Sequence, residues 1–242
     1  LKTFNAKFLN QKQINNMLTA IENEIIYLPV LLCSIYGLRR SEVLGIKWSC
    51  VDFENNTIHI CETLQQSTKE LTGESNYTDD TKNASSNRTM PLIPVIKEKL
   101  LVQKQWQIEN KKEFEELYSD SDFVFTHENG SVMTPNYLTK NFRRIADSLG
   151  YHGLRLHDLR HSVASNLLNK GFSYVQTAEW LGHSNPSTTF RFYAHVDKTS
   201  KIAIASDYEQ IFREEKSRKV VEKSVKIVEI NSYRANLKIL DK

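Results

Sequence analysis

Apolar positions recur with a helical period along most of the chain. Asn10 and Gln13 form a capping-box pattern, which predicts a helix that begins there and runs to Ile21. The apolar run over residues 25–36 predicts a second, buried helix that ends at Gly37. The same pattern predicts further helices over residues 42–48, 94–118, 134–149, 157–170, 173–181 and 201–212, with a short helix around Tyr193.

In the middle of the chain the period changes to the alternation of a β-strand. Val51 and Phe53 precede a polar turn, and residues 57–61 alternate between polar and apolar side chains. A stretch rich in Ser, Thr, Asn and Gly, residues 64–87, separates them from a third predicted strand over residues 88–92. The sequence therefore predicts one small antiparallel sheet.

No internal repeat and no interdomain linker interrupts this pattern in the sequence. The expected fold class is mainly α with a small antiparallel β-sheet (α+β). We expect one domain over residues 1–212, followed by a charged C-terminal tail over residues 213–242 that is natural or appended. Because the first residue is Leu1 and not Met, we expect the chain to be a fragment that lacks its natural N-terminal part.

The composition is that of an ordinary globular protein, with 40% hydrophobic and 25% charged residues among 242. Residues 213–242 hold nine Lys or Arg and five Asp or Glu, which leaves 23 basic and 24 acidic side chains in residues 1–212. Net charge therefore gives no argument for a nucleic-acid partner. If DNA is the partner, the basic side chains must gather on one face.

The sequence predicts neither export nor insertion into a membrane. The longest apolar run, residues 25–35, contains Pro29 and is too short to span a bilayer, and no signal-peptide pattern precedes it. Cys33, Cys50 and Cys61 are odd in number and lack CxxC spacing, so we expect reduced thiols with packing roles. These features together predict a cytoplasmic protein.

Four short motifs and one tyrosine supply residues suited to phosphoryl transfer. The candidate catalytic residues are Arg39, Lys82, His157, Arg160, His183 and Tyr193. Two guanidinium groups, a lysine and two imidazoles would surround a dianionic centre with built-in positive charge, so no metal ion is required. His157 and Arg160 stand three residues apart on one predicted helix, so both side chains can reach one phosphate.

Each residue alone also has an ordinary structural interpretation. Arg39 could simply pair with Glu42, and His183 could be a capping or core histidine. Lys82 could be a solvated lysine of a polar hairpin, and Tyr193 could pack among neighbouring aromatic residues. Only the ordered combination of the residues favours catalysis.

A zinc site is an alternative for His157 and His161, which stand at positions i and i+4 of a predicted helix. The zinc-protease motif requires Glu at its second position as the general base, whereas Asp158 stands there and the cation Arg160 is nearby. No third ligand is evident in the sequence. A zinc site is therefore not favoured.

The order and spacing of the motifs resemble the catalytic domain of the tyrosine recombinases, the lambda-integrase-like family. The motifs are Gly-Leu-Arg-Arg-Ser-Glu at 37–42, Lys82 followed by Ser-Ser-Asn-Arg-Thr at 85–89, His-Asp-Leu-Arg-His at 157–161, Leu-Gly-His-Ser at 181–184, and Ser-Thr-Thr at 187–189 before Tyr-Ala-His at 193–195. The resemblance covers roughly residues 10–212 and is greatest to integrases of conjugative transposons from Gram-positive bacteria.

The resemblance implies a site-specific DNA recombinase or integrase that moves a mobile element through a Holliday junction. Tyr193 would attack a DNA phosphodiester and give a 3′-phosphotyrosine intermediate with a free 5′-hydroxyl. The roles implied for the other residues are charge stabilisation by Arg39, Arg160 and His183, proton acceptance by His157 and proton donation by Lys82. No metal is implied, because the positive charge is built into the side chains. No cofactor such as ATP is implied, because the covalent bond conserves the energy of the phosphodiester.

The implied partners are double-stranded DNA attachment sites and further copies of the chain. The copies would form a tetramer on DNA and exchange their C-terminal helices, residues 201–212. An excisionase and a host DNA-bending protein are candidate accessory partners, and no membrane partner is expected. The N-terminal core-binding domain of the family is absent from the sequence, so DNA binding by this chain alone should be weak and sensitive to salt.

Two alternatives remain open at the level of sequence. A type IB topoisomerase shares the chemistry but works as a monomer. A non-catalytic DNA-binding regulator would use residues 173–189, which resemble a helix-turn-helix. That second alternative leaves Arg39, Lys82 and Tyr193 without a role.

Overall fold

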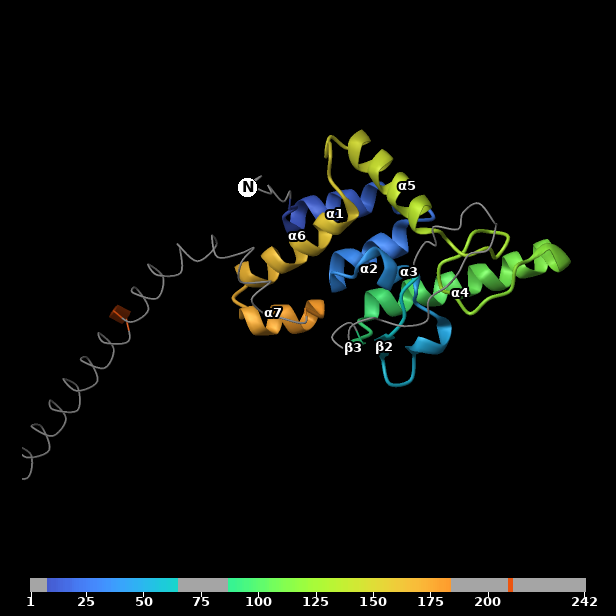
Figure 1. Ribbon diagram of the computed structural model, residues 1–242, viewed down its shortest axis with the longest axis horizontal. Coiled ribbons are helices and arrows are strands. Elements are labelled where there is room, and N and C mark those ends of the chain that lie inside the picture. The colour runs from blue at the N-terminus through green and yellow to red at the C-terminus, as the bar shows by residue number, and fades with distance from the viewer. Residues whose placement is uncertain (1–7, 65–86, 184–208, 211–242) are drawn as a thin grey trace, which may run out of the picture. The chain divides into compact units, whose positions relative to one another are not determined.

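The computed structural model describes residues 8–64, 87–183 and 209–210, and the chain divides into two compact units, Leu1–Phe192 and Tyr193–Lys242. The helices and strands of the first unit are α1 (Gln11–Ala20), α2 (Tyr27–Tyr36), α3 (Arg40–Leu44), β1 (Val51–Asp52), β2 (Thr57–Ile60), β3 (Arg88–Pro91), α4 (Pro94–Phe114), α5 (Pro135–Ser148), α6 (Leu156–Asn169) and α7 (Tyr174–Leu181) (Figure 1). Two 3-10 turns cover Trp48–Cys50 and Glu115–Leu117. The mainly helical α+β fold that the sequence predicts is confirmed.

Helix α2 forms the centre of the core. Val30 and Leu32 are fully buried, and the helix packs against α1, α3, α4 and α6. Figure 1 shows α2 between the group of α1, α6 and α7 and the long helix α4. Burial of such side chains contributes about 1.5–3 kcal/mol each, which makes α2 the scaffold on which the surrounding helices are fixed.

Gly37 ends α2 in the left-handed conformation, with φ of 63°. A Cβ atom at this position would lie 2.3 Å from Cδ2 of Leu181, so any side chain would collide with the end of α7. The missing side chain thus lets α7 pack against the end of α2, and protein fills the space.

The three strands form an antiparallel sheet in the order β1-β2-β3. In the register, Ile58 stands opposite Val51 on one side and Met90 on the other. Ile58 and Ile60 are buried while His59 between them is exposed, which is the alternation that the sequence predicts. The sheet is therefore fixed by one apolar face.

The predicted helix starts at Asn10 and Ser173 are confirmed in detail. The Asn10 side chain accepts a hydrogen bond from the Gln13 backbone N–H at 2.9 Å, and the Gln13 side chain accepts one from the Asn10 N–H at 2.9 Å. Ser173 and Gln176 make the same reciprocal pair at the start of α7. Such capping boxes satisfy N–H groups that the helix itself cannot pair.

The helix expected over residues 42–48 is wrong at both ends, because α3 runs from Arg40 to Leu44. Its earlier start follows from Glu42, whose carboxylate accepts a hydrogen bond from the Arg39 backbone N–H at 2.9 Å. Its end follows from Gly45, whose backbone packs so closely on Glu62 that a Cβ atom would lie 2.7 Å from the Glu62 carbonyl oxygen.

All three cysteines are free thiols. Cys33 is fully buried in α2, where burial raises the pKa of its thiol far above the ordinary value. Within the described stretches, no helix has the length and apolar character needed to cross a bilayer. Of the helix predicted over residues 201–212, only Glu209 and Gln210 are described, and both are helical.

Candidate active site

Four of the six candidate residues come together in the described part of the chain. Arg39 lies at the start of α3, His157 and Arg160 lie on α6, and His183 follows α7. Lys82 and Tyr193 lie outside the described residues.

Arg160 is the best-fixed member of the site, with only 3% of its surface exposed. Its Nη1 donates to the Gly37 carbonyl oxygen at 2.7 Å, and its Nε donates to Nε2 of His183 at 3.3 Å. One side chain on α6 therefore joins the end of α2 to the end of α7. The same contact sets the tautomer of a neutral His183, whose Nε2 accepts and whose Nδ1 must carry the proton.

His183 owes its position to the way α7 ends. Gly182 adopts the left-handed conformation with φ of 69°, and the His183 N–H donates to the Ala178 carbonyl oxygen at 2.9 Å. The Gly182 N–H donates to the Glu179 carbonyl oxygen at 3.0 Å, which completes a Schellman motif. The capping interpretation of His183 is thus correct for its backbone, while its imidazole belongs to the site.

Glu42 is the buried counter-charge of the site, with none of its surface exposed. Its carboxylate forms ion pairs with the guanidinium group of Arg39 and, at 3.4 Å, with that of Arg88 on β3. Burial alone would raise the pKa of the Glu42 carboxyl. Arg88, the Arg39 backbone N–H, and the guanidinium groups of Arg39 and Arg160 outweigh burial, so that the pKa lies below its usual value.

Both histidines of the site are neutral at physiological pH. Burial among protein atoms, followed by the charges of His161 and Arg160, lowers the pKa of His157 to about 4, even though its side chain also reaches solvent. Burial, followed by the charges of Arg160 and Arg39, lowers the pKa of His183 to about 4. The His157 ring stands perpendicular to that of His161, with centroids 5.2 Å apart. A neutral imidazole can accept a proton, which a charged one cannot.

The described residues give no support to a zinc site at His157 and His161, because no third ligand lies beside the pair there. Within the same ranges, one group of three possible ligand atoms lies within 4.8 Å, and it consists of Cys50, Cys61 and Glu62. The Glu62 carboxylate already pairs with Lys47 at 2.5 Å. Part of this group is therefore engaged without a metal.

Sequence reasoning missed the roles of Glu42, Arg88 and the Gly37 carbonyl group. Glu42 follows Arg39 by three residues and stands before the apolar pair Val43 and Leu44. A carboxylate at that spacing indicates a helix start, and its position beside two apolar residues indicates burial. No comparable local signal exists for Arg88, because its partner stands 46 positions away.

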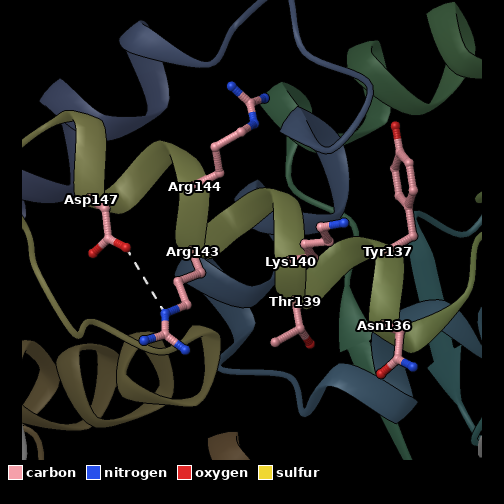
Figure 2. A pocket seen from close by; sticks show the side chains of 7 residues that line it. All are labelled: Asn136, Tyr137, Thr139, Lys140, Arg143, Arg144 and Asp147. Atoms are coloured by element: carbon pink, nitrogen blue, oxygen red, sulfur yellow. Dashed lines mark ion pairs between the residues drawn. The ribbon is translucent and has the colours of Figure 1, made fainter.

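A basic face on α5 is connected to the site through Arg40, the residue after Arg39. Nη1 of Arg40 donates to the hydroxyl of Thr139 on α5 at 3.0 Å. Figure 2 shows the side chains along a shallow pocket on this helix, which are Asn136, Tyr137, Thr139, Lys140, Arg143, Arg144 and Asp147. Arg143 and Arg144 are 73% and 60% exposed, and they pair only loosely, with Asp147 at 3.9 Å and Glu24 at 3.6 Å. Most of this positive charge faces solvent.

Comparison with known proteins places these features in a family. Residues 7–200 match the phage integrase family. The chain is 29% identical over 212 residues to a XerC-like tyrosine recombinase of Caldanaerobacter subterraneus subsp. tengcongensis, covering 82% of this chain and 53% of that protein. It is 26% identical over 186 residues to the transposase from transposon Tn916 of Enterococcus faecalis, covering 73% of this chain and 44% of that protein.

A solved structure agrees with these relatives. The Tn1549 transposon integrase in complex with transposon right end DNA superposes with a TM-score of 0.68 at 25% identity, covering 85% of this chain and 67% of that one. The chain spans about half the length of the relatives that it matches. The chain belongs to the phage integrase family, that of the tyrosine recombinases.

Proposed function

We propose that this chain is the strand-cleaving and strand-joining part of a site-specific DNA recombinase that integrates and excises a mobile element. The observation that carries the proposal is the partly buried contact of Arg160 with His183 beside Arg39. Three elements distant in sequence place their cationic and hydrogen-bonding groups around one point. Membership of the phage integrase family supports the same chemistry.

In the proposed reaction, Tyr193 attacks a DNA phosphodiester and becomes linked to the 3′-phosphate. The phosphate passes from one negative charge toward two, and Arg39 and Arg160 stabilise that added charge with paired donors. His183 donates from Nδ1, because Nε2 accepts from Arg160. Removal of one such donor from a preorganised site typically costs about 3–4 kcal/mol of transition-state stabilisation.

Two proton transfers accompany the attack. A phenol with a pKa of about 10 is protonated at neutral pH, so its proton must be accepted, and neutral His157 is the proposed acceptor. The departing 5′-oxygen needs a proton, and Lys82 is the proposed donor. A bound phosphate would oppose the positive field around His157 and raise its pKa, so its basicity would increase when DNA occupies the site.

The proposed substrate is double-stranded DNA, and α5 supplies a second contact. Lys140, Arg143 and Arg144 offer exposed positive charge on a helix whose start touches α3. The similar Tn1549 integrase is described in complex with transposon right end DNA. Attachment sites of a mobile element are thus the proposed DNA class, bound by four copies of the chain. We extend the proposal to an excisionase and a host DNA-bending protein as accessory partners.

The proposed assembly uses residues 201–212 as a helix that docks on a neighbouring copy. The boundary of the catalytic domain at residue 212, before the charged tail, belongs to the same proposal. A type IB topoisomerase would need no such exchange. A non-catalytic regulator would leave the partly buried pairing of Arg160 and His183 without a purpose, so we do not favour it.

A trapping experiment tests the proposal on the chain as it stands. Duplexes randomised in sequence, each with a 5′-bridging phosphorothiolate at one position, are incubated with the protein in excess EDTA and separated under denaturing conditions. We expect a covalent complex whose digested peptide carries a nucleotide on Tyr193. Tyr193→Phe should still bind DNA but should form no covalent complex. An adduct on another residue, or a strict need for added magnesium or zinc, would contradict the proposal.

A further inference from the structure

Arg88 occupies a position that the proposed reaction does not explain. It lies at the start of β3, its side chain is 10% exposed, and its guanidinium Nη2 is 3.4 Å from Oε2 of Glu42. The same carboxylate pairs through Oε1 with Nη1 of Arg39. One buried carboxylate therefore holds two guanidinium groups from different elements.

The two arginines differ in what surrounds them. The side chain of Arg39 is 37% exposed, so it reaches the open side of the site, whereas Arg88 is nearly enclosed. Arg88 also stands opposite Ile60 in the register of β2 and β3. The strand thus provides a rigid backbone for Arg88, and the guanidinium group of Arg88 fixes the carboxylate of Glu42 from behind.

We propose that Arg88 is a positioning residue for Arg39 and acts through the shared carboxylate of Glu42. This inference rests on the proposed function, in which Arg39 contacts the phosphate. Oε2 of Glu42 also accepts a hydrogen bond from the Arg39 backbone N–H at 2.9 Å, so Arg88 is a second partner on that oxygen. Its guanidinium group, on a different element, further restricts rotation of the carboxylate about its side-chain torsions. Arg88 therefore sets the direction in which Arg39 presents its remaining donors.

Arg88 also lies close in sequence to the segment that contains the proposed proton donor. The strand that carries it follows directly after residues 65–86, which contain the proposed proton donor Lys82. Leu64, at the other border of that segment, donates from its backbone N–H to the Ser41 carbonyl oxygen at 2.9 Å. Both borders are thus attached to α3, one through Arg88 and Glu42 and the other through Ser41.

Removal of Arg88 changes the charge balance around Glu42. The groups that face this carboxylate are Arg39 with its backbone N–H on α3, Arg88 on β3, Arg160 on α6 and the thiol of Cys33 on α2. Arg88 makes the largest contribution that favours the ionised carboxylate. Without Arg88, burial raises the pKa of Glu42. The carboxylate is then protonated at a higher pH and releases Arg39.

The test compares Arg88→Met with the wild-type chain on the trapping duplexes. We expect the rate of covalent-complex formation to fall roughly 10- to 100-fold, which is less than the roughly 100- to 1,000-fold loss when a transition-state donor is itself removed, with DNA affinity little changed. The acid limb of the pH–rate profile should move to higher pH. Arg88→Lys should recover part of the rate, because it keeps the charge but not the planar fork.

A double variant separates positioning from a general structural role. If Arg88 acts through Glu42, Arg88→Met combined with Glu42→Gln should cleave no more slowly than Glu42→Gln alone, and the pH shift should vanish. Lys97→Met is the matched control. It removes a cation that donates to the Phe53 carbonyl oxygen and Asn56 at 2.7 Å each, and so it weakens the sheet without touching Arg39. This control should cleave at the wild-type rate.

One readout does not depend on cleavage. Nitrogen-15 NMR of the Arg39 side chain reports rotation of its guanidinium group, which should be slow in the wild type and in Lys97→Met and fast in Arg88→Met. Unchanged rotation or an unchanged acid limb in Arg88→Met overturns the proposal, as does strict additivity in the double variant. If Arg88→Met does not fold, Arg88→Lys carries the same NMR and rate tests. A wild-type chain that makes no covalent complex refutes the proposed function, while the NMR result still decides the role of Arg88.

Discussion

The chain carries two groups of arginines whose surroundings are opposite. The buried cluster consists of Arg88 and Arg160 around Glu42, with the partly exposed Arg39 at its open edge, and the exposed group lies on α5 at Arg143 and Arg144. Arg160 is 3% exposed and Glu42 is fully buried, whereas the two α5 arginines are 73% and 60% exposed. Identical side chains are therefore used in one place as fixed charges and in the other as solvated ions.

The difference follows from the cost of desolvation. A buried guanidinium group requires partners, and the cluster supplies a carboxylate, a backbone carbonyl and an imidazole. Once those partners are in place, the groups need no reorganisation when the phosphate gains charge. An exposed arginine is screened by salt within about 8–10 Å and keeps its freedom to rotate. Such groups attract a polyanion without fixing its geometry.

The largest expected effect belongs to Arg160→Lys. Lysine keeps the charge but cannot donate to both the Gly37 carbonyl oxygen and His183 from a planar fork. We expect covalent-complex formation to slow by about 100-fold or more, while DNA affinity stays close to the wild-type value. Single-turnover cleavage and gel-shift titration measure the two quantities. A variant that loses affinity in proportion to rate would place Arg160 with the exposed group.

The second prediction concerns stability and compares two glutamates. Glu42→Ala leaves the buried guanidinium groups without their carboxylate, so the free energy of unfolding should fall by about 3–5 kcal/mol. Glu24→Ala removes the exposed partner of Arg144 and should cost less than about 1 kcal/mol. Urea denaturation of both variants measures the contrast. Equal decreases would mean that burial does not distinguish the two groups.

The third prediction concerns the exposed group. Lys140→Gln combined with Arg143→Gln should weaken DNA binding and reduce the salt slope by about 1.8, or about 0.9 for each phosphate that the protein no longer neutralises. Cleavage at saturating DNA should remain near the wild-type rate. Lys111→Gln is the control, because Lys111 is an exposed cation on α4 that pairs with Asp120. Fluorescence anisotropy at several salt concentrations gives the slope, and a normal slope in the double variant would remove α5 from the DNA interface.

Whether the sequence alone predicts a given contact depends on how far apart the two residues stand in the chain. Helix starts such as Asn10 with Gln13 are local, so the sequence predicts them correctly. The three-residue spacing of Arg39 and Glu42 also indicates a pair, and the pair is present together with the site. Local spacing thus predicts both the frame and part of the chemistry.

Long-range contacts could not be predicted in the same way. The contact of Arg88 with Glu42 depends on the register of β3, and the contact of Arg160 with the Gly37 carbonyl oxygen depends on the packing of α6 on α2. The start of α3 is misplaced for a different, local reason, because the Glu42 carboxylate caps the helix earlier than its apolar pattern indicates. The roles assigned to Lys82 and Tyr193 stay predictions.

The last expected effect is a dependence of stability on pH that comes from the site histidines. Their folded pKa of about 4 lies below the ordinary value of 6.5, so the unfolded chain binds more protons between these two pH values. Stability should therefore decrease as pH falls from about 6.5 toward about 4, and should not change on this account above pH 7. His157→Gln with His183→Gln should flatten that part of the urea-midpoint profile. A bound duplex should reverse the sign, because the phosphate favours the protonated imidazoles. A profile that is equally steep in the double variant would show that burial and the positive field of the cluster do not lower the pKa of these histidines.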